Sequence, residues 1–161
     1  MKLWGVFKPL LGLAALLAIA AADGSPARLG VLIGIVEADG KGEVTSFTPS
    51  PEIPNVPGTI YGWDLAIEDK SPMVKLMLTR EITMPAPTDW GPPEATVEIS
   101  PDRRIWRKTS EVTFEHGRFF EAMEISPGDP SGLVMVRFAV NGKNTPPFAI
   151  RFMPQGGAKQ K

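Results

Sequence analysis

In TIYGWDLAIED, residues 59–69, apolar side chains recur at every second position. An extended chain would place four of them on one face: Tyr61, Trp63, Leu65 and Ile67. The opposite face would carry the acidic Asp64 and Glu68. A period of two is the pattern of a β-strand with one face in the core and the other in solvent. The stretch therefore predicts a half-buried strand.

The same period recurs along most of the chain, over residues 74–79, 94–99, 112–114, 134–140 and 148–152. Seventeen prolines leave little room for long helices between these runs. We therefore expect an all-β protein, an antiparallel, immunoglobulin-like β-sandwich of about eight or nine strands. A closed β-barrel is the second choice.

Two short motifs predict where strands reverse direction. Asn141-Gly142 stands between two alternating runs, and both central positions of a type I′ hairpin turn need the positive φ that these residues tolerate. Asp39-Gly40 predicts a second hairpin, between residues 29–36 and 43–47. The strands that flank each motif should pair antiparallel.

The first 22 residues, MKLWGVFKPLLGLAALLAIAAA, have the pattern of a signal peptide. Lys2 and Lys8 give a positive start, an apolar run follows, and the small residues of 18–22 offer a cleavage site. The apolar run is shorter than the roughly 20 residues that a membrane-spanning helix needs. We expect cleavage near Ala22 and a periplasmic or secreted protein without a membrane span. An uncleaved anchor or a packed helix is the alternative.

After cleavage, residues 23–153 would form a single β-sandwich domain, and the polar residues 154–161 a disordered tail. The chain has no cysteine, so its stability in an oxidising compartment must come from a hydrophobic core. Removing Lys2 and Lys8 leaves 15 basic and 18 acidic residues, which moves the formal net charge from −1 to −3. This weak acidity argues against nucleic-acid binding, which favours a basic excess.

No set of residues specifies a reaction. The single histidine, His116, lies in Glu115-His116-Gly117-Arg118, where the glycine favours a hairpin turn. With one histidine and no cysteine, a conventional metal site would depend on carboxylates. No Gly-x-Ser-x-Gly motif supports a hydrolase. We expect a protein that is not an enzyme and has no cofactor, metal or catalytic residues, with a hydrolase using His116 as an alternative.

Two segments carry a tryptophan that is suited to partner contact. Residues 103–108 surround Trp106 with four cations, and Arg and Trp are frequent anchors of protein interfaces. On a strand, Arg104, Trp106 and Lys108 would share one face. The alternative is a charged edge strand, whose cations discourage edge-to-edge aggregation while Trp106 lies partly buried. The proline-rich loop 84–93 presents Trp90, which would otherwise fold back over one end of the core. The candidate contact surface consists of Arg104, Trp106, Lys108 and Trp90.

Turn glycines and core aromatics also recur in a recognisable order. They are Gly34-Ile35-Val36, residues 56–63 (VPGTIYGW), Phe114, Glu121, Pro127-Gly128, Phe138, Asn141-Gly142-Lys143 and Phe152. Over residues 34–153 this order resembles a bacterial family catalogued only as a domain of unknown function, family 3859. The chain departs from the family pattern after the Pro-Gly loop, where Leu133 and Val134 replace an aromatic residue. The resemblance implies an exported all-β protein without assigned activity, and it transfers no catalytic residue.

Three functional hypotheses remain open. The favoured one is a non-enzymatic binding or interaction module of the bacterial envelope, whose partner is an envelope protein or a glycan. The second is a carbohydrate- or small-molecule-binding module that uses Trp90 and Tyr61, because β-sandwiches often bind ligands on loops at one end. The third is a hydrolase that uses His116 and nearby carboxylates.

Overall fold

A computed structural model describes residues 3–4, 29–92 and 94–154, which form strands and turns without a helix. The twelve strands are β1 (Leu3–Trp4), β2 (Gly30–Ala38), β3 (Val44–Pro49), β4 (Glu52–Pro54), β5 (Ile60–Ala66), β6 (Met73–Thr83), β7 (Val97–Ile99), β8 (Ile105–Glu115), β9 (Arg118–Glu124), β10 (Gly132–Val140), β11 (Lys143–Asn144) and β12 (Phe148–Met153). Eight of them have six or more residues. The expected all-β fold is confirmed.

Most of the predicted signal peptide, and the tail from residue 155 onward, lie outside the described residues. Leu3–Trp4 form the two-residue strand β1, which pairs with β9. In the described part of the chain, no helix has the length and apolar character to cross a membrane. The domain limits 23–153 therefore stay a prediction.

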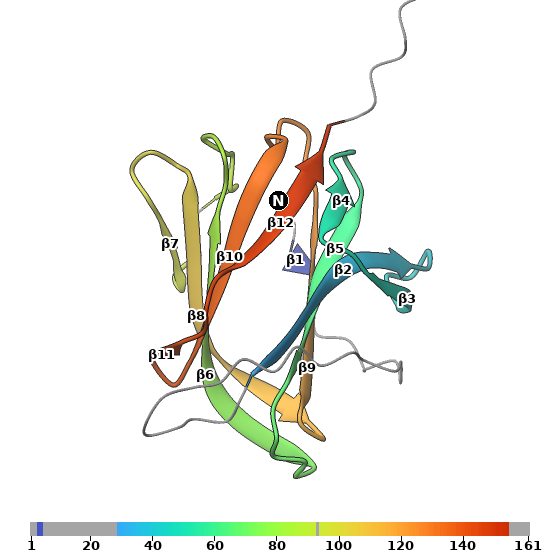
Figure 1. The fold of residues 1–161 in the computed structure, drawn as a ribbon, viewed down its shortest axis with the longest axis vertical. Coiled ribbons are helices and arrows are strands. Elements are labelled where there is room, and N and C mark those ends of the chain that lie inside the picture. Colours follow the sequence, from blue (N-terminus) through green and yellow to red (C-terminus); the bar gives the residue numbers. More distant parts are fainter. Residues whose placement is uncertain (1–2, 5–28, 93, 155–161) are drawn as a thin grey trace, which may run out of the picture.

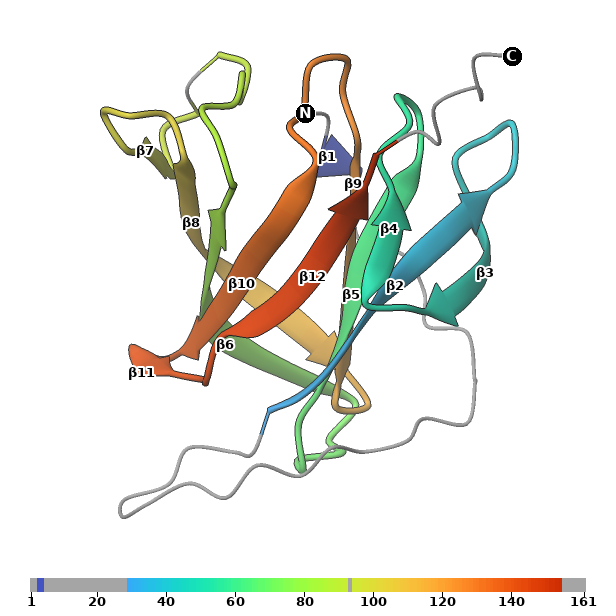
Figure 2. The same cartoon turned by 45° about the horizontal axis from the view of Figure 1, so that its top comes forward.

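The strands form one hydrogen-bonded sheet that curls into two layers (Figures 1 and 2). Their order is β3-β2-β5-β9-β8-β6-β10-β12-β4, with β1 beside β9, β7 beside β8 and β11 beside β10. β8 and β9 pair only at their shared turn, through Glu115 and Arg118. We call β3, β2, β5 and β9 the first sheet, and β7, β8, β6, β10, β12 and β4 the second sheet. All pairings are antiparallel except that of β4 with β12.

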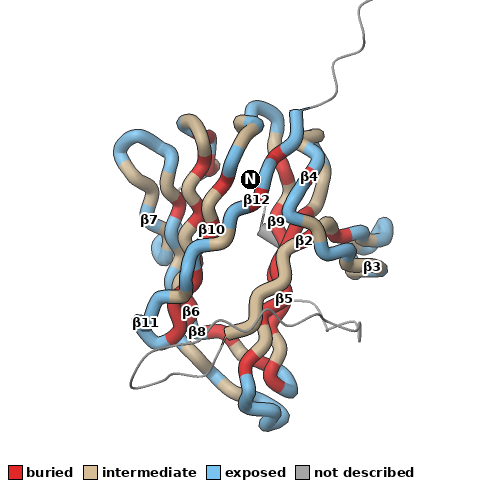
Figure 3. Tube along the Cα trace, in the orientation of Figure 1, coloured by how far each residue is buried: buried red, intermediate tan, exposed pale blue. Residues whose placement is uncertain are grey.

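Aromatic side chains between the two sheets form the core. Trp63 on β5 meets Phe138 on β10 edge to face, with ring centroids 5.5 Å apart. Tyr61 meets Phe152 on β12 in the same way, at 5.2 Å. Figure 3 shows the buried residues along the strands and the exposed ones mainly at the turns. The predicted inward face of residues 59–69 is confirmed, because Tyr61, Trp63 and Leu65 are fully buried.

The prediction that this strand is only half buried is wrong. Asp64, on the outer face of β5, is also buried. β5 lies between β2 and β9, and Arg118 of β9 pairs with the Asp64 carboxylate through two nitrogens. A neighbouring strand therefore supplies the counter-ion that lets an acidic residue leave solvent.

Three predicted turns are present. Asn141 and Gly142 have φ of 49° and 79°, as a type I′ hairpin requires, and they connect β10 with β11. The turn that begins at Asp39 connects the antiparallel strands β2 and β3. His116 and Gly117 also have positive φ, 49° and 77°, in the tight turn between β8 and β9. His116 thus occupies the predicted hairpin turn.

Candidate functional site on the outer face of the second sheet

The two tryptophans of the predicted contact surface are buried and lie together. Trp90 and Trp106 stack with ring centroids 6.3 Å apart and ring planes 27° apart. The Trp90 indole N–H donates to the carbonyl of Arg103 at 2.8 Å. Trp90 has therefore folded back onto the core, which was the alternative interpretation of its loop. These contacts leave little indole surface for a partner.

The other two predicted residues are divided between interior and surface. Lys108 lies on the same inward face of β8 as Trp106, and its ammonium group donates to Glu94 at 2.9 Å. Arg104 is exposed, and its Nε donates to the carbonyl of Met84 at 3.1 Å. β8 is not an edge strand, because β6 and β7 pair with it on opposite sides. Of the four predicted contacts, Arg104 alone is exposed, and partner binding through this set stays a prediction.

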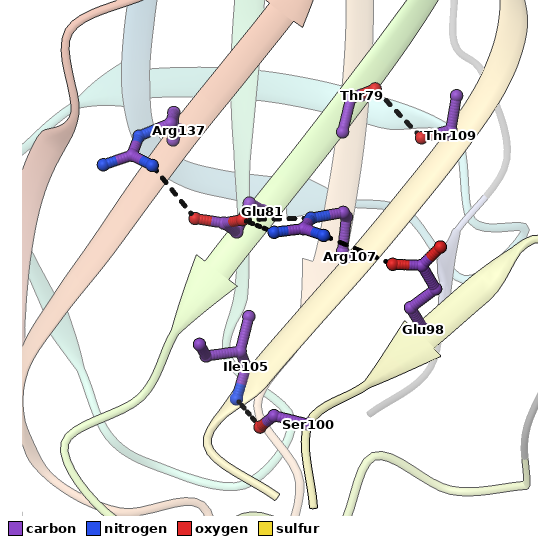
Figure 4. A network of polar contacts seen from close by, with 8 residues as sticks. All are labelled: Thr79, Glu81, Glu98, Ser100, Ile105, Arg107, Thr109 and Arg137. Carbon is purple, nitrogen blue, oxygen red and sulfur yellow. Dashed lines mark hydrogen bonds and ion pairs between the residues drawn. The ribbon is translucent and has the colours of Figure 1, made fainter. Parts of the chain in front are cut away.

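A row of alternating charges crosses the outer face of the second sheet (Figure 4). Its members stand in register on four neighbouring strands: Glu98 on β7, Arg107 on β8, Glu81 on β6 and Arg137 on β10. Arg107 donates to the Glu81 carboxylate through Nη2 at 2.5 Å and Nε at 3.0 Å, and through Nη1 to Glu98 at 3.3 Å. The Arg137 Nη1 lies 3.5 Å from Glu81 Oε1. We call these four residues the charge row.

Charge is compensated better in the middle of the row than at its ends. The hydrogen bond and negative charge of Glu81 raise the pKa of the Arg107 guanidinium, so this residue stays protonated throughout the accessible pH range. Among the described residues, Glu98 and Arg137 each have one ion contact within the row. Their side chains are 78% and 46% exposed. Both ends of the row are therefore available to an external charged group.

A shallow depression of about 150 Å³ lies beside the Arg137 end of the row. It is lined by Thr79, Glu81, Arg107, Arg137, Phe138, Ala139 and Asn144. At the next outward position along the strands, Thr79 pairs with Thr109 and with Ala139. These short side chains leave a hollow beside the long arginine side chains of the charge row. The Thr79 and Thr109 hydroxyls lie 2.9 Å apart. The depression thus offers hydroxyl, amide and guanidinium groups to a small polar group.

The same outer face carries every large hydrophobic side chain that is exposed in the described part of the chain. These are Met73 and Met77 on β6, Leu133 on β10 and Met153 on β12. Met73 and Met77 alternate with inward residues in the same register as Glu81. Leu133 shares the outward register of Arg137, and Met153 follows Arg151, the partner of Leu133, at the next outward position. Met77 and Leu133 therefore stand four residues from the charge row, on opposite sides of it, and Met73 lies a further four residues along β6.

A second polar cluster joins the two sheets through the core. Arg80 on β6 and Glu121 on β9 are only 1% and 5% exposed, and Arg80 Nε lies 3.5 Å from Glu121 Oε2. The Trp63 indole N–H donates to the same carboxylate at 3.1 Å, and Arg80 Nη2 donates to Ser110 at 2.7 Å. Burial raises the pKa of Glu121, and the positive charge of Arg80 opposes this rise. Both residues are shielded from solvent, so the pair links the two sheets and is not accessible to a partner.

Sequence analysis did not identify either cluster. The predicted strand pattern over residues 74–79 ended at Thr79. Continuing the same period would have placed Arg80 on the apolar face, between Leu78 and Ile82. The described residues contain no group of three or more potential metal ligands. Tyr61, considered for a ligand site, is fully buried, and its burial raises the pKa of the phenol. The backbone N–H of His116 donates to the carbonyl of Pro72 at 3.2 Å.

The two packed layers, crossed by aromatic pairs, define the class of this protein as a β-sandwich. The chain belongs to the PM0630 beta sandwich domain family, whose sequence model matches residues 31–152. The narrower resemblance to family 3859 stays a prediction. No curated protein matches the chain.

Several solved structures are similar to this chain, and two of them are from Pseudomonas species. One is an immunoglobulin-like protein (PA1606) from Pseudomonas aeruginosa, with 15% identity and a TM-score of 0.46 over 81% of this chain and 100% of that chain. The other is the alkylpurine DNA glycosylase AlkC from Pseudomonas fluorescens, bound to DNA containing an abasic site analog. It has 11% identity and a TM-score of 0.36, over 76% of this chain and 30% of that chain.

Proposed function

We propose that this protein is a non-enzymatic interaction module of the bacterial envelope that binds a partner protein through the outer face of the second sheet. One observation carries the proposal: Met73, Met77, Leu133 and Met153, the exposed large hydrophobics among the described residues, all lie on this face. Single exposed apolar residues are common on protein surfaces, but their restriction to one face, on both sides of the charge row, favours that face as an interface.

The composition of this face also fits an interface better than a small-molecule site. Methionine and arginine are enriched at protein interfaces, and the flexible methionine side chain adapts to different partners. The depression of about 150 Å³ is smaller than the pockets of roughly 300 Å³ or more that hold drug-sized ligands. It suits one side chain of a partner better than a whole metabolite.

The envelope location rests on the predicted signal peptide, and it is tested separately from binding. The tagged chain is produced in its natural bacterium, crosslinked in intact cells and analysed by mass spectrometry. A chain that begins near Asp23 and is crosslinked to one reproducible envelope protein supports the proposal. A chain that keeps residues 1–22 and remains in the cytoplasm contradicts it.

The binding face is tested by placing a charge in its apolar part. Leu133→Lys should abolish the crosslink, because Leu133 is exposed on the outer face and a desolvated ammonium group weakens an interface. Thr45→Lys, at an exposed position of β3 in the first sheet, is the matched control. If both variants fold and retain the same crosslinked partner as the unchanged chain, the outer face of the second sheet is not the binding surface.

A further inference from the structure

We infer that the outer face of the second sheet binds a second copy of this chain, with the two charge rows facing one another in reversed order. The inference rests on the proposed function, because it uses the same face and names a second copy of this chain as the protein that covers it. In the resulting two-fold dimer, Glu98 of each copy enters the depression beside Arg137 of the other copy.

The order of charges makes the row complementary to itself. Read from β7 to β10, the row is negative, positive, negative, positive: Glu98, Arg107, Glu81 and Arg137. When the order is reversed, Glu98 of one copy faces Arg137 of the other, and Arg107 faces Glu81. All four contacts between copies are then attractive. Electrostatic complementarity of this kind fixes the register of two surfaces and suppresses other arrangements.

The symmetry axis follows from this pairing. A two-fold axis that runs parallel to the strands, between β6 and β8, reverses the order of the strands while keeping each row at its own level. A homodimer interface of this type is isologous, because the same patch is used by both copies. Thr79 on β6 then faces Thr109 on β8 of the second copy. These short side chains permit the close approach that the longer side chains of the row need.

The two end residues of the charge row lie where the second copy would supply the opposite charge. Glu98 and Arg137 are the ends of the row, and each has one ion contact within it. The reversed order brings these two ends together at both edges of the interface. Within the depression, the Arg137 guanidinium and the Asn144 amide can donate to the Glu98 carboxylate, and the Thr79 hydroxyl can do so when Thr109 donates to it. A volume of about 150 Å³, roughly five water molecules, accommodates such a group.

A charge-swap experiment tests the reversed order directly. Glu98→Arg makes the row positive, positive, negative, positive, so two like-charge contacts arise when this variant pairs with itself. Arg137→Glu has the same effect with opposite sign. In a mixture of the two variants, however, all four contacts become attractive. Within its own chain, each variant replaces one surface ion pair with a like-charge pair on neighbouring strands, which is a small cost at the edge of the row, so both should fold.

The complete chain is purified from its host, and its association is measured by sedimentation velocity. The unchanged chain should dimerise, and added salt should weaken the dimer. For each variant alone, the dissociation constant of the dimer should rise by about tenfold or more. The mixture should form mixed dimers at least as tight as those of the unchanged chain. Lys41→Glu and Glu43→Arg, exposed in the β2–β3 turn, repeat the two charge changes elsewhere and should leave dimerisation unchanged.

Two results would overturn the inference. One is an unchanged chain that stays monomeric at millimolar concentration. The other is a pair of folded variants that associate no better in mixture than alone. If circular dichroism shows either variant to be unfolded, the neutral variants Glu98→Gln and Arg137→Gln make the test: each should weaken the dimer, whereas the control Lys41→Gln should not. If the chain does not dimerise, a crosslink to a different envelope protein would still support the proposed function. Failure of the inference is therefore distinguishable from failure of the proposed function.

Discussion

Replacing Glu121 with Gln should destabilise the protein by about 3 kcal/mol, although the two side chains have nearly the same shape. The carboxylate lies 3.5 Å from Arg80 Nε and is 5% exposed, so the substitution leaves a buried guanidinium without its counter-ion. The amide oxygen of Gln can still accept the Trp63 indole N–H, and Arg80 keeps its bond to Ser110. Loss of the charge, and not loss of packing, therefore sets the effect.

The magnitude follows from the degree of burial. Removing one member of a buried ion pair typically costs 3 to 5 kcal/mol, whereas exposed pairs contribute about 1 kcal/mol or less. The lower end of that range applies here because Ser110 continues to accept a hydrogen bond from Arg80. For a domain of this length, a loss of 3 kcal/mol lowers the melting temperature by roughly 10 °C.

A double-mutant cycle separates charge from packing. Arg80→Met alone leaves Glu121 buried without its cation, and Arg80→Met combined with Glu121→Gln removes both charges. The double variant should be more stable than Glu121→Gln alone, with a coupling free energy of about 2 kcal/mol or more. The free energy of unfolding is measured by urea titration followed by circular dichroism, and an unchanged denaturant slope confirms that the comparison is valid.

The pH dependence of Arg80→Met provides an independent check. Burial raises the pKa of Glu121 above its usual 4.5, and Arg80 opposes that rise. Without Arg80, the folded-state pKa rises further, so the folded protein binds a proton at a pH where the unfolded chain does not. The stability lost in Arg80→Met should therefore be regained as the pH falls from the folded pKa towards 4.5. The reasoning would be refuted if the free energies of unfolding of the single and double variants all lay within about 0.5 kcal/mol of that of the unchanged chain and the effects of the two substitutions were additive.

Three further predictions concern other parts of the chain. Trp90→Ala should lower the free energy of unfolding by about 3 to 5 kcal/mol, measured by urea titration, because Trp90 is buried and stacks on Trp106. Gly117→Ala should lower the melting temperature clearly more than Gly142→Ala, since both have positive φ but a Cβ at Gly117 would lie 2.5 Å from the Asp69 carbonyl oxygen. Intact-mass spectrometry of the protein from its host should give a chain that begins near Asp23, and retention of residues 1–22 would contradict the predicted export.

The fold could be predicted from the sequence because its signals are local. Tyr61, Trp63 and Leu65 alternate within one strand, and Asn141-Gly142 specifies a turn within two residues. The candidate site could not be predicted, because it depends on strand order. Glu81 and Arg137 are 56 positions apart in the chain and become neighbours only because β10 pairs with β6. No local pattern in the sequence specifies that pairing.

In β8, adjacent residues point to opposite sides of the sheet, one into the core and the next to the surface. Trp106 and Lys108 point inward, whereas Arg107 between them points outward and joins the charge row. The sequence correctly grouped Trp106 with Lys108, because residues two apart share a face of a strand. The sequence does not say which face of this strand is buried. A tryptophan and a lysine on one face suit an interface, and they also suit a core that contains the acidic Glu121. Trp106 points into the core, where Trp90 from the loop 84–93 stacks on it. For the same reason, the β8 cation that faces outward is Arg107, which the grouping by alternation excluded.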